Sequence, residues 1–160
     1  FAALLAALAD LPGAPPIDRV SIGDLAGYAD PFRLVQGAEA WRHHGDWVRR
    51  HPDALGPAVA ERMRAASQVN ADDEERARAD LTTRAEHLRD VVTTRVLIAP
   101  TVPGPAPSRT ATGDGVADVR TRTLRMTTPA SVAGLPSLSL PLLTIPSPLG
   151  PAPVGVCSSS

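Results

Sequence analysis

The sequence predicts an α/β protein with a helical first half and short strands in its last third. Apolar residues recur at helical spacing up to about residue 93, and a continuous apolar run at 96–99 follows the last of these helices. Two further short segments, at 137–140 and 154–157, have strand patterns between proline-rich loops. This order of helices and strands is typical of part of an α/β layered domain.

The composition allows one domain and excludes a nucleic-acid binder. The chain has 160 residues, of which 43% are hydrophobic and 3% aromatic, so a core would be built from aliphatic side chains. All 16 basic residues are arginine, and they alternate with 17 acidic residues to give a net charge of −1. Proteins that bind nucleic acid usually carry a basic stripe, which this sequence lacks.

Cysteine use and hydropathy predict a cytoplasmic protein. Cys157 is the single cysteine, so no internal disulfide can form and a reducing compartment is expected. No apolar run reaches the roughly 20 residues that a membrane helix needs. The opening segment FAALLAALA has no charged leader, so we do not expect a secretion signal.

Three helices are predicted before residue 70. The first covers 1–9 and ends at the segment DLPGAPP. The second is expected to start with Asp30 as its N-cap and Pro31 in its first turn, and to run to about Arg50. The third is expected near 56–68.

A fourth helix is predicted from Asn70, which can act as its N-cap. The buried stripe of this helix is expected to consist of Ala77, Leu81, Ala85, Leu88 and Val92. The pairs Glu74/Arg78 and Asp80/Arg84 place an acid four residues before a base, which stabilises a helix.

The second half begins with the run at 96–99, which predicts a strand buried on both faces, as in a parallel sheet. The loop at 100–117 is long enough to form the wall of a cleft. A helix is expected from Asp118 to Met126, and a second proline-rich loop at 144–153.

The segment TPASVAGLPSLSLP at 128–141 predicts a short helix followed by a strand. Thr128 can cap that helix, Pro129 suits its first position and Gly134 suits its end. Residues 137–140 then alternate polar and apolar, which indicates a strand with one buried face. The strand PVGVC is expected to stop at the serines that follow Cys157.

Four segments in order resemble the C-terminal part of amidase signature family enzymes. They read AEAWRHHGDWVRRHPDALGPAVAERMRAA, VLIAPTVPGPAP, TTPASVAGLPSLSLP and APVGVC, and together they extend over nearly the whole chain. The resemblance implies a fragment of an α/β/α layered fold with a mixed sheet. Residues 1–160 would be the C-terminal part of one amidase domain, helical to about 93 and built of strands and loops from 94 to 160.

The resemblance also implies an activity, the hydrolysis of a carboxamide C–N bond without a cofactor or metal. The family uses a serine nucleophile, a second serine in a cis peptide and a lysine base, all in its N-terminal half. These 160 residues contain no lysine and no matching Gly/Ser-rich loop. Arginine stays charged and cannot replace the base, so we expect the isolated chain to be inactive.

Three residues are expected to line the pocket for a small amide substrate in the full-length enzyme. Thr101 follows the apolar run in the Pro-Thr position, and Thr128 and Ser131 precede the Gly-x-Pro turn. Ser131 stands where many family members carry asparagine. We identify no catalytic residue and no metal ligand within the chain.

Two other groups of residues could form a site. Ser137 and Ser139 could act as nucleophiles, but they lack a Gly-x-Ser-x-Gly elbow, and alternation with leucine explains them as strand residues. A polar helix surface equally explains the possible metal ligands, which are His43, His44, Asp46 and His51.

The alternative function is a non-catalytic helical module that binds another protein through residues 30–92. The coding sequence before Phe1 discriminates between the two, because an amidase requires a Gly/Ser-rich loop and a lysine there.

Overall fold

The computed structural model describes residues 1–108, 110–111, 113–145 and 152–159. Their helices and strands are α1 (Ala2–Ala9), α2 (Leu25–Arg50), α3 (Pro57–Ala66), α4 (Ala71–Val92), β1 (Leu97–Pro100), α5 (Asp114–Ala133), β2 (Ser137–Ile145) and β3 (Ala152–Ser159). The α/β class and the helical first half are confirmed.

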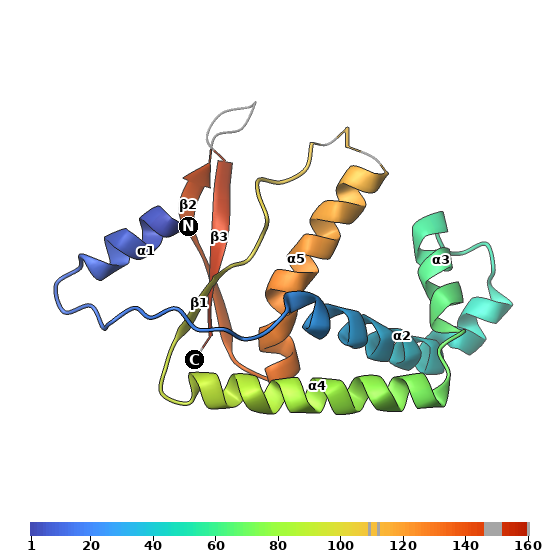
Figure 1. Ribbon diagram of the computed structural model, residues 1–160. Helices are drawn as coiled ribbons and strands as arrows, with labels where there is room; N and C mark the ends of the chain where they lie inside the picture. Colours follow the sequence, from blue (N-terminus) through green and yellow to red (C-terminus); the bar gives the residue numbers. More distant parts are fainter. Residues whose placement is uncertain (109, 112, 146–151, 160) are drawn as a thin grey trace.

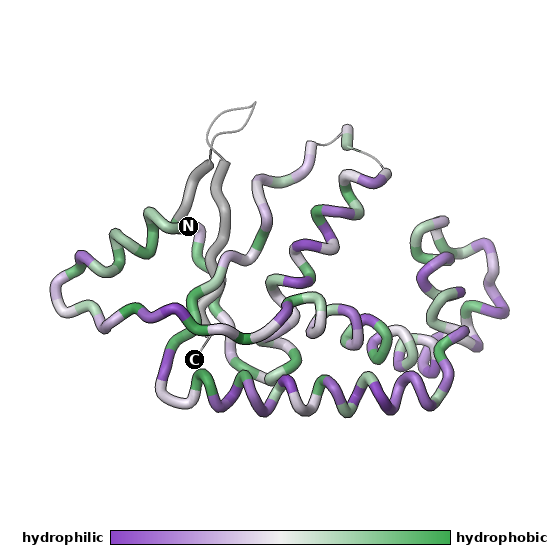
Figure 2. The backbone as a smooth tube through the Cα atoms, viewed as in Figure 1, coloured by the Kyte–Doolittle hydropathy of each residue, from purple (hydrophilic) through white to green (hydrophobic). Residues whose placement is uncertain are grey.

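Helices α2, α4 and α5 pack against one another, and α3 packs against α2. The sheet stands on the other side of α5 from α3, and α1 lies beyond the sheet at the end of a long connecting segment (Figure 1). Hydrophilic and hydrophobic residues alternate along α4 (Figure 2), as expected for a helix with one buried face.

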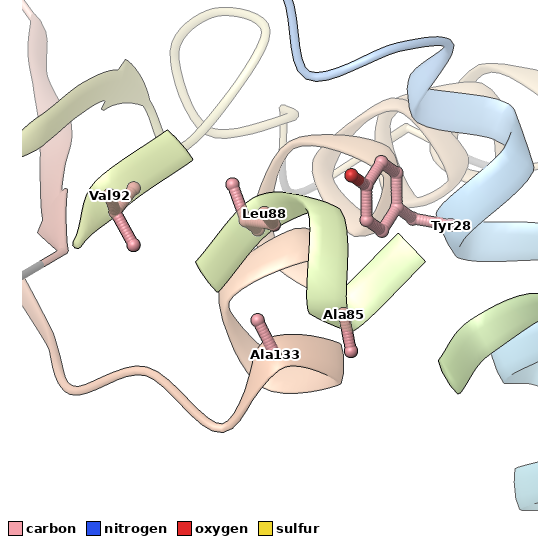
Figure 3. Close-up of a cluster of buried hydrophobic side chains, with 5 residues drawn as sticks. All are labelled: Tyr28, Ala85, Leu88, Val92 and Ala133. Atoms are coloured by element: carbon pink, nitrogen blue, oxygen red, sulfur yellow. The ribbon is translucent and has the colours of Figure 1, made fainter. Parts of the chain in front are cut away.

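The core lies where α2, α4 and the end of α5 meet (Figure 3). Tyr28 and Leu88 are fully buried, and Ala85, Val92 and Ala133 complete the cluster. The Tyr28 hydroxyl donates a hydrogen bond of 2.8 Å to the carbonyl of Ile22. Burial of the ring raises the Tyr28 pKa, because the anionic form would lose solvation.

Helix α4 matches its prediction. The Asn70 side chain accepts a hydrogen bond of 2.8 Å from the Asp73 amide, so Asn70 is the N-cap. In the predicted stripe, Leu81 is half-buried and the other four residues are buried. Both predicted acid–base pairs form, as Glu74–Arg78 at 2.7 Å and Asp80–Arg84 at 2.9 Å.

The predicted start of the second helix is wrong. Helix α2 begins at Leu25, and its N-cap is Asp24, whose side chain accepts from the Ala26 amide at 3.1 Å. Pro31 lies inside the helix. The extra turns are stabilised because Tyr28 and Ala29 are buried in the core. This burial outweighs the loss of the backbone hydrogen bond that Pro31 cannot donate.

The predicted break before Thr128 is also wrong, because α5 is one helix with Pro129 inside it. Thr128 is not an N-cap, because its hydroxyl donates a hydrogen bond of 2.6 Å to the carbonyl of Leu124, one turn earlier. Both Thr128 and Pro129 are buried, so packing holds the helix together at this point. Gly134 ends it in the left-handed conformation, as predicted.

The described strands form a sheet in the order β1-β3-β2, and both pairings are antiparallel. The register between β2 and β3 shifts between Leu140 and Leu143. Pro141 lies at this shift, which is where a strand tolerates a residue without an amide donor. Strand β2 runs to Ile145 and β3 begins at Ala152, so the strand predicted at 137–140 was too short and the loop predicted at 144–153 was too long.

Two strand predictions need correction. The run at 96–99 corresponds to β1, which is half-buried and antiparallel to β3, not buried on both faces in parallel pairing. Strand β3 does not stop after Cys157, because Ser158 and Ser159 pair with β1 and β2. A mixed sheet would need strands beyond these three and stays a prediction.

Among the residues that the structure describes, no helix is both long enough and apolar enough to cross a membrane.

Candidate functional site

Thr101, the first predicted pocket residue, comes directly after β1. Its side chain is 9% exposed, which makes it one of two buried polar residues in the described part of the chain. The backbone bends through the residues that follow. The loop begins after β1 at Thr101 and ends where α5 begins at Asp114, so the predicted loop bounds of 100–117 and the predicted helix start at Asp118 were wrong.

Thr128 and Ser131 lie one turn apart near the end of α5. Thr128 is 3% exposed and its hydroxyl proton is used within the helix, whereas Ser131 is exposed. Helix α5 brings these two residues together and packs mainly against α2 and α4, whereas Thr101 follows β1.

The end of α5 is fixed by a Schellman motif. The Leu135 amide donates to the carbonyl of Ala130 at 3.0 Å, and the Gly134 amide donates to that of Ser131 at 3.2 Å. Gly134 has a φ of 64°, a conformation that strains other residues. The motif sets the direction in which the chain leaves the helix for β2.

A second clamp on this turn comes from α4. The Arg89 Nε donates a hydrogen bond of 2.9 Å to the carbonyl of Ala133, in the last turn of α5. A cation at a helix C-terminus also interacts favourably with the helix dipole. Arg89 thereby holds the helix that carries Thr128 and Ser131.

Sequence reasoning missed Arg89. Its partner lies 44 residues away, and on α4 it is one of several arginines at helix-surface spacing. A basic residue near a helix end normally pairs with its own helix, so the pattern gave no signal for a contact with α5.

A hollow opens in another part of the molecule. It has a volume of about 960 Å³ and lies between α1, residues 15–20 and residues 91–98. A smaller hollow of about 260 Å³ adjoins α1 and shares Ile17 and Ile98 as walls. Neither hollow is lined by Thr101, Thr128 or Ser131.

The residues of the two competing sites lie in β2 and in or directly after α2. Ser137 and Ser139 lie in β2, opposite Ser159 and Cys157 of β3. Among the residues that the structure describes, no three His, Cys, Asp or Glu side chains gather closely enough to hold a metal ion. His51, one of the possible metal ligands, follows the end of α2 and stacks on Trp47, with ring centroids 4.7 Å apart.

The strongest electrostatic feature joins α2 to α4. Arg42 binds the Glu74 carboxylate in a bidentate pair at 2.6 and 2.9 Å, and Arg78 bridges Glu74 and Glu39. The hydrogen bonds from Arg42 and Arg78 lower the Glu74 pKa to about 2. This network stabilises the helix packing that supports α5.

The three predicted pocket residues carry hydroxyl groups, which can form hydrogen bonds but need a base before they can act as nucleophiles. The Ser131 hydroxyl is exposed and can exchange hydrogen bonds with an amide, whereas the buried Thr128 hydroxyl already donates to the carbonyl of Leu124. Activation of a serine requires a neighbouring base. Arg89, which donates to the last turn of α5, does not release its proton and cannot supply that base.

Comparison with known proteins confirms the resemblance to the amidase signature family. No protein-family profile matches the chain. It is 28% identical over 122 residues to Amidase 1 of Arabidopsis thaliana, a match that covers 76% of this chain and 29% of the relative.

Solved structures have the same fold. A crystal structure of an amidase superposes with a TM-score of 0.83 and 25% identity, over 99% of this chain and 37% of its own. A bacterial aryl acylamidase of the amidase signature family gives a TM-score of 0.58, with 18% identity over 89% of this chain and 32% of its own. The chain thus has the α/β fold of part of an amidase, and it spans about a third of the length of the proteins it resembles.

Proposed function

We propose that this chain is the C-terminal part of an amidase that hydrolyses a carboxamide C–N bond in a small molecule. The observation that carries the proposal is the superposition of 99% of the chain on a solved amidase at 25% identity. The 28% identity to Amidase 1 supports it independently from sequence.

In this proposal the catalytic residues lie outside the 160 residues. A serine would attack the amide carbon, a second serine in a cis peptide would pass its proton on, and a lysine would accept it. Without that base the serine keeps its proton at neutral pH. The chain contributes α5 and three strands. In this proposal the three strands belong to a larger mixed sheet, within one cytoplasmic amidase domain.

The proposed role of Thr101, Thr128 and Ser131 is to line the substrate pocket. The Ser131 hydroxyl is exposed and can reach a ligand, while the buried Thr128 supports the helix beneath it. Arg89 would keep this helix end in place through its bond to Ala133.

The alternative, a helical module for protein binding, receives less support. The apolar faces of α2 and α4 that would bind a partner are already buried against each other and against α5, as the burial of Tyr28 and Leu88 shows. The outer faces carry the charged network of Glu74.

The test is an assay for amide hydrolysis on two polypeptides. The 160-residue chain should release no ammonia or amine from aliphatic and aryl amides, whereas the product of the coding sequence extended before Phe1 should do so. Turnover by the short chain that Ser137→Ala or Ser139→Ala abolishes would refute the assignment of catalysis to the missing part. An extended sequence without a Gly/Ser-rich loop and a lysine would refute the amidase function itself.

A further inference from the structure

Helix α1 is apolar on every side, yet it has no buried residue. Ala2–Ala9 consists of alanine and leucine alone, and none of these side chains is buried. A helix that is hydrophobic all round is normally found in the interior of a protein. Figure 2 shows the hydrophobic colouring of α1, which projects beyond the sheet.

The hollow of about 960 Å³ extends this apolar surface toward β1. We call the combined area the N-terminal apolar surface and define it by Phe1, Leu5, Leu11, Ile17, Val20 and Val96. Val96 is 57% exposed and Leu11 is 56% exposed, although both are large aliphatic residues. Exposed apolar residues gathered in this way mark an interaction site.

The total surface shows how large the missing contact is. The chain has an accessible surface of 10710 Å². A folded monomer of 16.7 kDa typically exposes about 7,600 Å². The excess of about 3,100 Å² is several times the roughly 800 Å² that each partner buries in a standard interface. The excess belongs to the whole chain, and exposed apolar residues of the N-terminal apolar surface contribute to it.

We infer that the N-terminal apolar surface is the seam against which the rest of an amidase domain packs. The inference rests on the proposed function, and it adds the place on this chain where the catalytic part binds. A small amide is far too small to cover such an area. A longer amidase, of which this chain matches 37%, offers a partner of the necessary size.

The test mixes the 160-residue chain with the polypeptide encoded directly before Phe1, produced separately. Light scattering should find a one-to-one complex. Hydrogen exchange should slow in Ala2–Ala9 and in residues 91–98, and remain unchanged in α3. A protection pattern that omits α1 and residues 91–98 would overturn the inference.

Matched substitutions test which residues of this chain form the contact with the catalytic part. Val96→Asp would bury an unpaired charge in the seam and should weaken the complex by at least about a hundredfold. Val59→Asp makes the same change on α3, where Val59 is 39% exposed, and should alter binding by less than about twofold. Leu5→Asp repeats the first change on α1, which buries no residue in this chain, so misfolding would not explain its effect.

The remaining outcomes separate this inference from the proposed function. Formation of a complex without amide hydrolysis would support the seam and refute the activity. Hydrolysis that Val96→Asp and Leu5→Asp leave intact would support the activity and refute the seam. A dimer of the chain itself that Val96→Asp dissociates would identify a second copy as the occupant and overturn the inference.

Discussion

Arg89 connects two helices through one hydrogen bond. Its Nε donates to the carbonyl of Ala133, a residue that is 2% exposed. A carbonyl in such a position loses its solvation on folding and has to be compensated by a protein donor. Arg89 therefore fixes the Gly134 turn more firmly than its place on a charged helix suggests.

Arg89→Met keeps the aliphatic stem and removes the donor. We expect it to reduce the free energy of unfolding by about 1–3 kcal/mol and to speed hydrogen exchange at the Gly134 and Leu135 amides. Arg76→Met is the matched control, because Arg76 is exposed on the same helix, and it should change stability by less than about 0.5 kcal/mol. Equal effects of the two variants would contradict the proposed clamp.

Leu88 is the centre of the helical core and is fully buried. Leu88→Ala should lower the free energy of unfolding by about 2–5 kcal/mol, since it leaves a cavity between α2, α4 and α5. Leu11→Ala removes the same atoms from an exposed position and should cost less than about 0.5 kcal/mol in the isolated chain. Urea unfolding followed by circular dichroism measures both, and a small effect at Leu88 would show that the core is loosely packed.

The helices α2 and α4 are joined by the Glu74 network as well as by apolar contacts. Four charged residues take part, namely Glu39, Arg42, Glu74 and Arg78. The network is near the surface, so salt should weaken it. Its contribution to stability should depend on pH in a direction that the Glu74 pKa defines.

The Glu74 pKa is about 2 in the folded chain and near 4.5 when the chain is unfolded. A lowered pKa means that the stabilisation is present above about pH 4.5 and is lost as the pH falls toward about 2. The difference in urea midpoint between the wild type and Glu74→Gln should therefore shrink over this range. Glu75→Gln, an exposed neighbour outside the network, is the control, and a difference that stays constant with pH would exclude Glu74 as its source.

Two helix boundaries show what local sequence signals can and cannot predict. Asp30-Pro31 and Thr128-Pro129 both have the pattern of a helix start, yet α2 and α5 run through both prolines. The deciding factor was burial of the surrounding residues against α4, which depends on contacts distant in the sequence. The boundaries at Asn70 and Gly134 were predicted correctly, because a side-chain cap and a left-handed glycine are local devices.

The fold as a whole was predictable to the level of class and element order. Strand pairing was not, since the apolar run at 96–99 is compatible with parallel or antiparallel partners. The predicted pocket residues were located but not joined into a site: Thr128 and Ser131 share α5, while Thr101 follows β1. Most of the predicted loop at 144–153 lies outside the described residues.

The position of β3 in the sheet has a consequence for the order of folding during synthesis. This strand lies between β1 and β2, which do not pair with each other, and it is the last of the three to leave the ribosome. Within this sheet, neither β1 nor β2 has a strand partner until β3 is available to pair with both. The helices can pack beforehand, because their contacts need no residue beyond α5. The sheet that these three strands form is thus completed only after β3 has been synthesised, whereas the contacts among α2, α4 and α5 do not depend on it.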